Sequence, residues 1–313
     1  MSGEENLLHI LPMSQTLFDS FFQGKPRDFL LRAVSTALEE DGPDLTSLAL
    51  FAQGERLVAE GVAKERLVIA GLPVIPLVLA ALADAAPEDF DLRMAVHDGD
   101  EVEPGTRLFL LEGPAAPLLK AERIILNFLC HLSGIATLTK HYAAQLKGSR
   151  TRLLDTRKTL PGLRHAEKYA VRVGGGLNHR MDLAEMLMLK DTHLDRAGSI
   201  TGAVAMLRAA YSPCPPIEVE CRTLDEVREA VACEAQRIML DNMDMPTMAE
   251  ALGLVPSGIE TEISGGVSFD RLGELATLGA DFVSVGRLTH SAPTADISLR
   301  VVRGKAKHED PAS

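Results

Sequence analysis

From about residue 150 onward, short apolar runs end in polar or glycine residues, and helical segments separate the runs. The residues at the ends of these runs are Asp155, Lys190, Glu220, Asp241, Ser264 and Gly286. They follow one another at intervals of 21 to 35 residues, which is typical of repeated βα units and a parallel sheet. These units are fewer than a closed barrel contains, so the pattern predicts an α/β fold with an incomplete, open barrel. A doubly wound sheet is the alternative, but no G-x-G-x-x-G follows the first strand.

The part of the chain before residue 150 has a different pattern. Apolar residues recur at helical spacing from Leu30 to Leu38, and strand-like segments follow at 57–63 and 107–113. Residues 117–146 predict a long helix that breaks near Ser133-Gly134. The sequence therefore predicts a small α+β sandwich domain with an antiparallel sheet ahead of the barrel.

Composition excludes several classes of protein. With 46% apolar and 24% charged residues the chain has enough material for a full core, and its net charge of −12 disfavours general nucleic-acid binding. The uncharged segment 67–83 contains glycine and prolines, and predicts a buried strand–turn–helix rather than a membrane span. No C-x-x-C pair occurs, and the start of the chain is acidic. We therefore expect a cytoplasmic protein, outside the membrane, with reduced and mostly buried thiols at Cys130, Cys214, Cys221 and Cys233.

A basic segment lies inside this acidic chain. Between Arg152 and Arg180 there are seven Lys or Arg residues against two acidic ones. Such a segment would attract an anionic substrate, and an Arg side chain binds carboxylate or phosphate with two parallel hydrogen bonds. A solvated helix face accounts well for three of these residues, Arg164, Lys168 and Arg172. It accounts poorly for the cluster next to a strand end and a glycine run, which consists of Arg157, Lys158, His179 and Arg180.

Glycines and carboxylates complete the pattern at the predicted strand ends. The runs Gly174–Gly176 and Gly265-Gly266, together with Gly286, would let backbone N–H groups approach phosphate oxygens, although such runs also serve as simple turns. Glu220 and Asp241 end consecutive strands, where they are candidates to hold Mg²⁺ or to pair with the basic cluster.

These motifs together resemble the quinolinate phosphoribosyltransferase family. The resemblance covers nearly the whole chain and is most specific from Asp155 to Arg180. Its motifs are Asp98-Gly99-Asp100, Glu122-Arg123, Asn127, His131 to Thr137, Asp155 to Arg164, Glu167 to Val171, Gly174 to Arg180, Leu189-Lys190-Asp191, Ile217 to Glu220, Leu240-Asp241-Asn242, Ser264-Gly265-Gly266 and Ser284 to Ser291. The chain departs from the family at Thr192, where Asn is usual, and at Leu160, where Thr is frequent.

The resemblance implies an architecture and a reaction. It implies an N-terminal α/β sandwich (residues 1–127, joined by 291–313), an open barrel (128–290), and a homodimer whose active sites lie at the subunit boundary. The family transfers phosphoribosyl from phosphoribosyl pyrophosphate to quinolinate with Mg²⁺. The products are nicotinate mononucleotide, pyrophosphate and CO₂, in the de novo synthesis of NAD.

The resemblance also implies roles for single residues. The quinolinate site would contain Arg157, His179, Arg180 and Lys190, with Arg123 supplied by the second subunit. The phosphoribosyl pyrophosphate site would contain Lys158, Glu220, Asp241, Ser264, Gly265, Gly266, Gly286 and His290. The catalytic residues would be Lys158, Lys190, Glu220 and Asp241, and the last two would also be the candidate Mg²⁺ ligands. The residue that assists decarboxylation stays open between Lys190 and Arg157.

Three other functions fit parts of the pattern. A molybdenum-transport-associated paralogue family shares the Thr-Arg-Lys-Thr and His-Arg motifs and would have an accessory or ligand-binding role. A barrel enzyme that forms a Schiff base would use Lys158 or Lys190. A ligand-binding dimer without catalysis would bind both anions and release no pyrophosphate.

Overall fold

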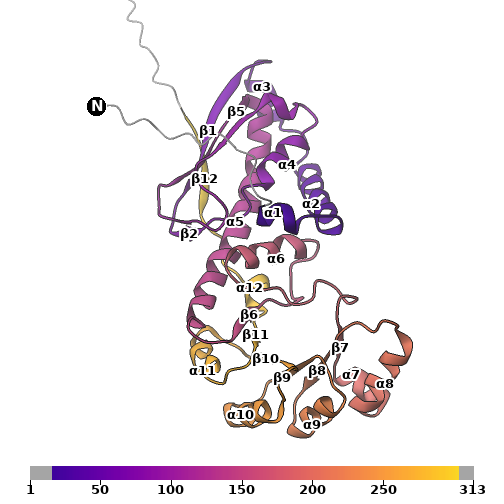
Figure 1. The fold of residues 1–313 in the computed structure, drawn as a ribbon. Coiled ribbons are helices and arrows are strands. Elements are labelled where there is room, and N and C mark those ends of the chain that lie inside the picture. The colour runs from indigo at the N-terminus through magenta and orange to yellow at the C-terminus, as the bar shows by residue number, and fades with distance from the viewer. Residues whose placement is uncertain (1–15, 303–313) are drawn as a thin grey trace, which may run out of the picture.

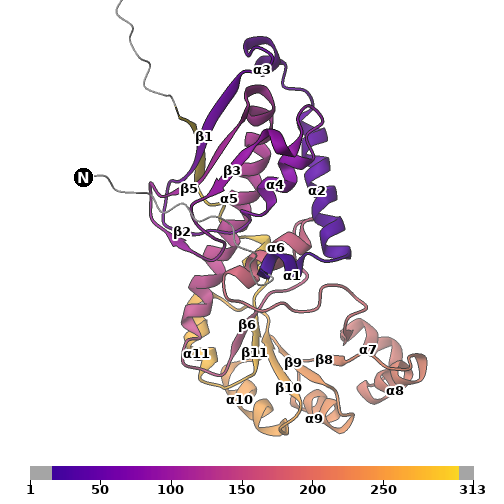
Figure 2. The ribbon, with the colours of Figure 1, turned by 45° about the horizontal axis from the view of Figure 1, so that its top comes forward.

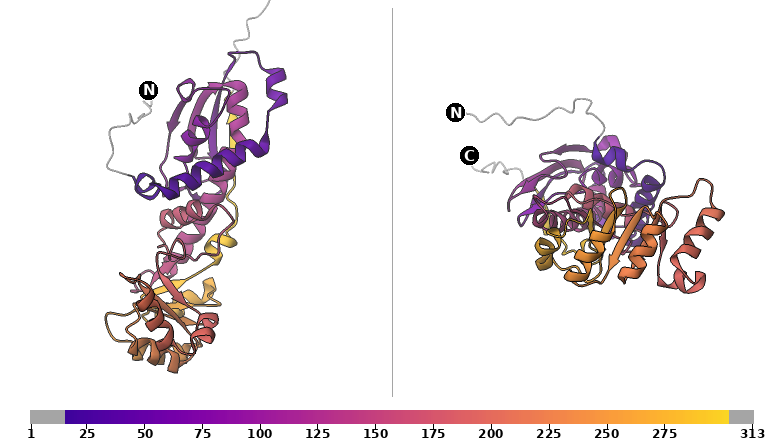
Figure 3. Two further views of the ribbon diagram at one scale, coloured as in Figure 1. Left: turned by 90° about the vertical axis from the view of Figure 1, so that its right-hand side faces the viewer. Right: turned by 60° about the horizontal axis from the view of Figure 1, so that its bottom comes forward.

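The computed structural model describes residues 16–302, and these residues form two units joined end to end (Figure 1, Figure 3). The first is an antiparallel sheet with helices packed on it, and the second is a parallel sheet with helices around it. Helix α5 (Ala115–Gln145) extends from the first unit into the second. The predicted fold class, an open α/β barrel after an α+β sandwich, is confirmed.

The sheet of the first unit has four strands, and the last of them comes from the C-terminal end of the described chain. In spatial order the strands are β12 (Ile297–Val301), β1 (Arg56–Ala63), β5 (Arg107–Pro114) and β3 (Asp91–Met94). All three pairings are antiparallel, as predicted from the strand-like segments 57–63 and 107–113. Because β12 pairs with β1 from Ala59↔Val301 to Ala63↔Ile297, the chain returns to its first unit after it completes the second.

Helices pack against this sheet, and two short strands form a separate pair beside it (Figure 2). The uncharged segment 67–83 is a buried strand, turn and helix, as predicted. No helix among residues 16–302 is long and apolar enough to cross a membrane. The elements are α1 (Leu17–Phe21), α2 (Lys25–Asp41), α3 (Leu45–Leu50), β2 (Leu67–Val68), α4 (Val74–Ala80), the 3₁₀ helix η1 (Pro87–Asp89) and β4 (Glu101–Val102).

Helix α5 does not break near Ser133-Gly134, so that prediction is wrong. Both residues serve contacts on the sides of the helix. The Ser133 hydroxyl accepts from the backbone N–H of Ala70 at 3.0 Å, and a Cβ on Gly134 would collide with the carbonyl of Pro293. The small side chains that suggested a helix break therefore allow other segments to pack closely against an unbroken helix. The predicted boundary between residues 127 and 128 lies inside this helix.

The second unit contains one parallel sheet of six strands. In spatial order they are β6 (Arg152–Leu154), β11 (Phe282–Ser284), β10 (Glu260–Ser264), β9 (Arg237–Asp241), β8 (Ile217–Cys221) and β7 (Leu187–Leu189). The first and last of these strands do not pair with each other, and Leu177 adds a single parallel bridge to Leu154. The barrel is therefore open. Each polar or glycine residue that was predicted to end an apolar run lies at or beside the carboxyl end of its strand.

The helices of this unit lie around the sheet (Figure 1). They are α6 (Arg164–Val173), α7 (Asp191–Ala197), α8 (Ile200–Ala210), α9 (Leu224–Ala232), α10 (Met245–Leu254), the 3₁₀ helix η2 (Phe269–Arg271), α11 (Leu272–Ala276) and α12 (Arg287–His290). Of these, α6 and α12 lie on the side of the first unit (Figure 1). Helix α6 packs between the two units, where the Tyr169 hydroxyl donates to Asp98 at 2.7 Å. The carboxyl ends of the strands consequently face the first unit.

The cysteines agree only partly with the prediction. Cys221 is buried and the other three are half-buried, and all four are free thiols.

Candidate active site

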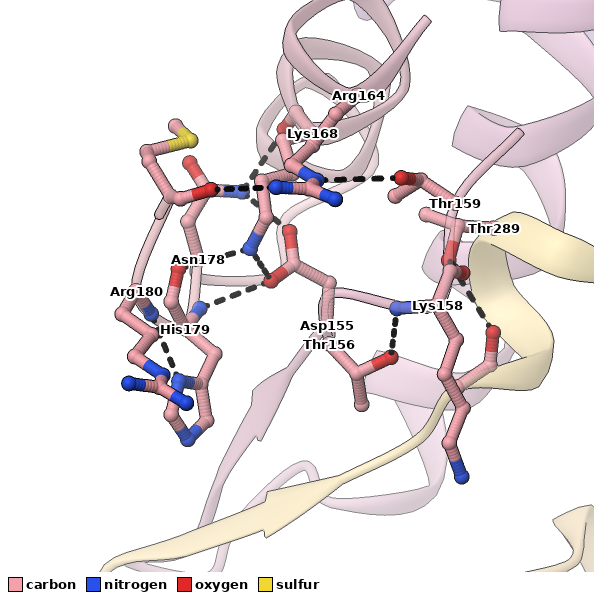
Figure 4. Close-up of polar contacts among 12 residues, drawn as sticks. Asp155, Thr156, Lys158, Thr159, Arg164, Lys168, Asn178, His179, Arg180 and Thr289 are labelled. Atoms are coloured by element: carbon pink, nitrogen blue, oxygen red, sulfur yellow. Dashed lines mark hydrogen bonds and ion pairs between the residues drawn. The ribbon is translucent and has the colours of Figure 1, made fainter. Parts of the chain in front are cut away.

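A fully buried ion pair anchors one side of the strand ends. Asp155 follows β6 and accepts from Lys168 of α6, and both side chains are completely buried. The same carboxylate accepts from Asn178 Nδ2 at 2.7 Å and from the backbone N–H of His179 at 2.8 Å (Figure 4). Burial raises the pKa of Asp155 and lowers that of Lys168, and their mutual attraction opposes both shifts. The segment that carries His179 and Arg180 is thereby fixed to the end of β6.

The basic helix face is therefore only partly solvated, contrary to the sequence prediction. Arg172 is exposed and Arg164 is half-buried, whereas Lys168 is enclosed. Besides Asp155, Lys168 Nζ donates to the carbonyl of His179 at 2.8 Å. Sequence spacing alone did not reveal this, because the acidic partner lies on a different element.

Two arginines near this anchor, Arg157 and Arg180, are close enough to repel each other. Arg180 is 7% exposed, and its Nη1 donates to the carbonyl of Met186 at 2.7 Å. Burial, and then repulsion from Arg157, lower the pKa of Arg180. The Nε atoms of both arginines are buried and have no hydrogen-bond partner among residues 16–302. Buried donors of this kind are normally paired, so the pair is suited to bind an anion.

The ring of His179 faces two carboxylates that the sequence analysis did not identify. Glu218 of β8 and Glu262 of β10 are fully buried, and their nearest oxygens lie 3.1 Å and 3.5 Å from His179 Nε2. Arg237 of β9 contributes its Nη1 at 3.4 Å from Glu262. Burial raises the pKa of Glu218 to about 7, and burial with repulsion from Glu218 raises that of Glu262 to about 8. Both carboxylates lie within apolar strands, where a rule based on strand ends does not find them.

His179, Glu218 and Glu262 are also close enough together to hold a metal ion, since one donor atom from each lies within 4.8 Å of the others. Two contacts oppose a metal there. The backbone N–H of Arg180 donates to His179 Nδ1 at 2.7 Å, so a neutral ring has its proton on Nε2, the atom that a metal would need. The guanidinium of Arg237 already lies against Glu262. The arrangement therefore favours hydrogen bonding over metal binding.

A more exposed rim lies at the carboxyl ends of β7, β8 and β9. Lys190 Nζ lies 3.6 Å from Glu220, and Arg222, another residue that the sequence did not indicate, lies between acidic groups. Its guanidinium is 3.4 Å from Glu220, 3.5 Å from Asp241 and 3.0 Å from Asp191. The side chains of Lys190 and Arg222 are 47% and 50% exposed. Glu220 and Asp241 thus contact the same cationic side chain, although it is Arg222 and not a member of the predicted basic cluster.

The ends of the last two barrel strands form a cradle with little side-chain bulk. After β10, which ends at Ser264, Gly265 has a φ of +86° and Gly266 a φ of +57°. A Cβ on Gly265 would collide with Asn242 at the end of β9. The cradle therefore depends on glycine both for backbone conformation and for space.

Lys158 and α12 complete this cradle. A Cβ on Gly286 would lie 3.0 Å from Lys158 Cδ and 3.3 Å from His290 Cδ2. The Thr289 hydroxyl donates to the carbonyl of Lys158 at 2.7 Å (Figure 4). The loops after β6 and β11 are thus tied together, and Lys158, Gly286 and His290 come together as the sequence predicted.

The first glycine run has a different purpose from the one suggested by its sequence. A Cβ on Gly174 would collide with the carbonyl of Ala136 in α5, and one on Gly176 would lie 3.0 Å from Thr139 Cγ2. Gly174 and Gly176 therefore permit the close packing of this segment against α5.

Arg123 does not join the other predicted residues within one chain. Its side chain is exposed on α5, beside a surface hollow that it lines with residues 41–46, Leu119 and Lys120. The departure at Leu160 is also exposed, and its backbone N–H donates to the buried Glu167 at 3.2 Å.

Comparison with known proteins covers both units. Residues 44–133 match the N-terminal domain, and residues 135–300 the C-terminal domain, of the family described as quinolinate phosphoribosyl transferase. The chain is 40% identical over 276 residues to a probable nicotinate-nucleotide pyrophosphorylase [carboxylating] of Bacillus subtilis, covering 87% of this chain and 93% of the relative. It is 38% identical over 272 residues to the Mycobacterium leprae enzyme of that name, covering 85% and 95%. The solved nicotinate-nucleotide pyrophosphorylase of Francisella tularensis superposes with a TM-score of 0.81 at 33% identity, covering 89% of this chain and 98% of that one.

Proposed function

The chain belongs to the quinolinate phosphoribosyltransferase family, and on that premise we propose that its open barrel end joins quinolinate to phosphoribosyl pyrophosphate. The products are nicotinate mononucleotide, pyrophosphate and CO₂, so the protein is a pentosyltransferase of NAD biosynthesis. The observation that carries the proposal is the arginine pair, Arg157 and Arg180. Their buried Nε donors have no partner in the described part of the chain, and they lie in the same strand-end region as a glycine cradle.

Quinolinate fits the cationic side of this region. It is a planar dianion, and a charge-assisted hydrogen bond contributes about 1.5–3 kcal/mol. Arg157 and Arg180 repel each other without a ligand, and a dianion between them removes that repulsion. In this proposal Lys190, on the exposed rim, and His179, next to Arg180 in the chain, complete the quinolinate pocket. Positive charge near the departing carboxylate is what decarboxylation requires, and Lys190 and Arg157 are the two candidates to supply it.

Phosphoribosyl pyrophosphate fits the glycine side. The backbone from Ser264 to Gly266 and at Gly286 would bind its 5-phosphate together with His290. Transfer at the anomeric carbon develops positive charge on the ribose, which a carboxylate such as Glu220 or Asp241 stabilises. Lys158, above Gly286, would neutralise the departing pyrophosphate.

The carboxylates of Glu220 and Asp241 also suit Mg²⁺. Hard oxygen ligands are what Mg²⁺ prefers, usually with water and substrate phosphates as its other ligands. Both carboxylates already contact one cationic side chain, Arg222, so their negative charges face the same region. When bound, Mg²⁺ would supply charge neutralisation for the pyrophosphate.

A second copy of the chain completes the site in this proposal. Arg123 is exposed on α5 and separate from the strand ends of its own chain. We infer that the working form is a homodimer in which Arg123 of one subunit reaches the quinolinate pocket of the other. A molecular mass measured by light scattering, and complementation between inactive Arg123→Ala and Lys190→Ala chains, would test this inference.

The reaction itself is tested by mixing purified protein with quinolinate, phosphoribosyl pyrophosphate and Mg²⁺ and measuring pyrophosphate release. We expect equal amounts of pyrophosphate and CO₂, and release that depends on all three additions. Binding of both anions without pyrophosphate would instead indicate a ligand-binding dimer or an accessory role like that of the molybdenum-transport-associated paralogues. Trapping of a carbonyl substrate by borohydride would indicate a Schiff base, and we expect none.

A further inference from the structure

We propose that Glu218 and Glu262 are positioning residues for the quinolinate pocket, which hold the His179 ring in one tautomer and thereby fix Arg180. This inference rests on the proposed function for the identity of the ligand. The arrangement of the buried side chains carries the rest of the argument.

The first step concerns the two nitrogens of His179. Nδ1 accepts from the backbone N–H of Arg180 at 2.7 Å, so it has no proton. Burial lowers the pKa of His179, which favours the neutral ring. A neutral ring without a proton on Nδ1 has its proton on Nε2, and Nε2 faces the two carboxylates at 3.1 Å and 3.5 Å.

The second step concerns what these carboxylates lack. Both oxygens of Glu218, Oε1 of Glu262 and Nε2 of His179 are buried and have no complete hydrogen bond among residues 16–302. Buried polar atoms without partners are costly. One short movement of the ring toward Glu218 would satisfy donor and acceptor together, and such hydrogen bonds often tighten when a substrate binds. We therefore assign the Nε2 proton to a bond shared between Glu218 and Glu262.

The third step connects the ring to the pocket. The hydrogen bond on Nδ1 fixes the peptide of Arg180, and the guanidinium of Arg180 is held at its far end by Met186. A ring in the other tautomer would present a proton to the Arg180 N–H and push this peptide away. The carboxylates thus act through His179 on the direction of Arg180, without contact with the ligand. Glu262 also lies 3.4 Å from Arg237 Nη1, which fixes this carboxylate from the side of β9.

The test compares two substitutions at one position. Glu218→Leu removes the acceptor, and we expect the KM for quinolinate to rise ~10- to 100-fold while the KM for phosphoribosyl pyrophosphate stays within ~2-fold. Glu218→Gln keeps an acceptor oxygen and should restore the KM for quinolinate. Cys221→Ala, a buried change on the same strand away from His179, is the matched control and should leave both constants unchanged.

A spectroscopic measurement on the unaltered protein keeps the proposal testable if Glu218→Leu does not fold. Nitrogen-15 NMR of labelled histidine, with His179 assigned by His179→Gln, should show the neutral Nε2–H tautomer. A signal from the Nδ1–H tautomer, or from imidazolium at neutral pH, would overturn the proposal. Equal rises in both KM values would also overturn it, because they would indicate general damage to the barrel. Failure of pyrophosphate release in the unaltered protein would instead reject the function and leave the tautomer result standing.

Discussion

The two sides of the barrel's open end hold their charges in opposite ways. On the inner side, Asp155, Lys168, Glu218 and Glu262 are completely enclosed, and each has another ionisable side chain as neighbour. On the rim, Lys190 and Arg222 are about half exposed and meet their carboxylates at 3.0–3.6 Å. Enclosed charges need fixed partners, whereas exposed ones exchange partners with water and ligands at little cost. The inner side is therefore organised before a ligand arrives, and the rim is free to rearrange around one.

The largest effect that we expect comes from removing one enclosed partner. Lys168→Met would leave Asp155 buried and uncompensated, which costs about 3–5 kcal/mol of the free energy of unfolding. Urea denaturation followed by circular dichroism measures this loss. Arg172→Met, an exposed change on the same helix, is the control and should have little effect. A Lys168→Met protein as stable as the parent would contradict the contrast between enclosed and exposed charges.

A change on the rim should instead affect chemistry and spare stability. Lys190→Ala is expected to lower kcat/KM for quinolinate at least ~100-fold, because a cation near the reacting carboxylate is lost. Its urea midpoint should match that of the parent. Lys147→Ala, another exposed lysine, serves as the control for a loss of surface charge. Near-normal turnover by Lys190→Ala would argue against the proposed roles of the rim.

The inner carboxylates should also affect how stability depends on pH. The pKa of Glu262 is raised from 4.5 to about 8, so the folded chain binds this proton more tightly than the unfolded chain. As pH rises from about 4.5 toward 8, this group lowers the free energy of unfolding, by at most ~1.4 kcal/mol per pH unit. Glu262→Gln removes the titrating group. The free energy of unfolding of this variant, relative to that of the parent, should therefore increase between about pH 6 and about pH 8. An unchanged difference across that range would show that Glu262 is ionised throughout.

The smallest effect is expected at Arg222. Its contacts with Glu220, Asp241 and Asp191 are exposed and therefore screened by water and salt. Arg222→Gln should leave the urea midpoint unchanged at both low and high salt. A large shift at low salt that disappears at high salt would show that the rim is as strongly coupled as the inner side.

The same division separates what the sequence could predict from what it could not. Lys190, Glu220, Asp241 and Gly286 follow apolar runs, and because parallel strands end at one edge, their grouping could be read from spacing. Glu218, Glu262 and Lys168 lie inside apolar or helical segments, and their partners come from other strands or helices. A pairing of that kind depends on the order of strands in the sheet, which a linear pattern does not give.

Two corrections within the fold have a similar cause. In the sequence, Gly134 suggests a helix break and Gly174 suggests a phosphate-binding loop or a turn. In the structure, the backbone of another segment lies close to each of them. Whether a glycine serves a turn, a ligand or a neighbouring segment is decided by what lies next to it in space. The sequence identified these positions as special, and only the packing distinguished the reasons.

The return of β12 to pair with β1 has a practical consequence for anyone who wishes to dissect this chain. A fragment that stops after α12 would leave one side of β1 unpaired, with hydrogen-bonding groups available to another molecule's strand. The barrel segment expressed alone would carry β12 without the neighbour it pairs with. Gene-fusion boundaries placed between the two units would thus tend to yield aggregates, and the polypeptide is best handled as one inseparable piece.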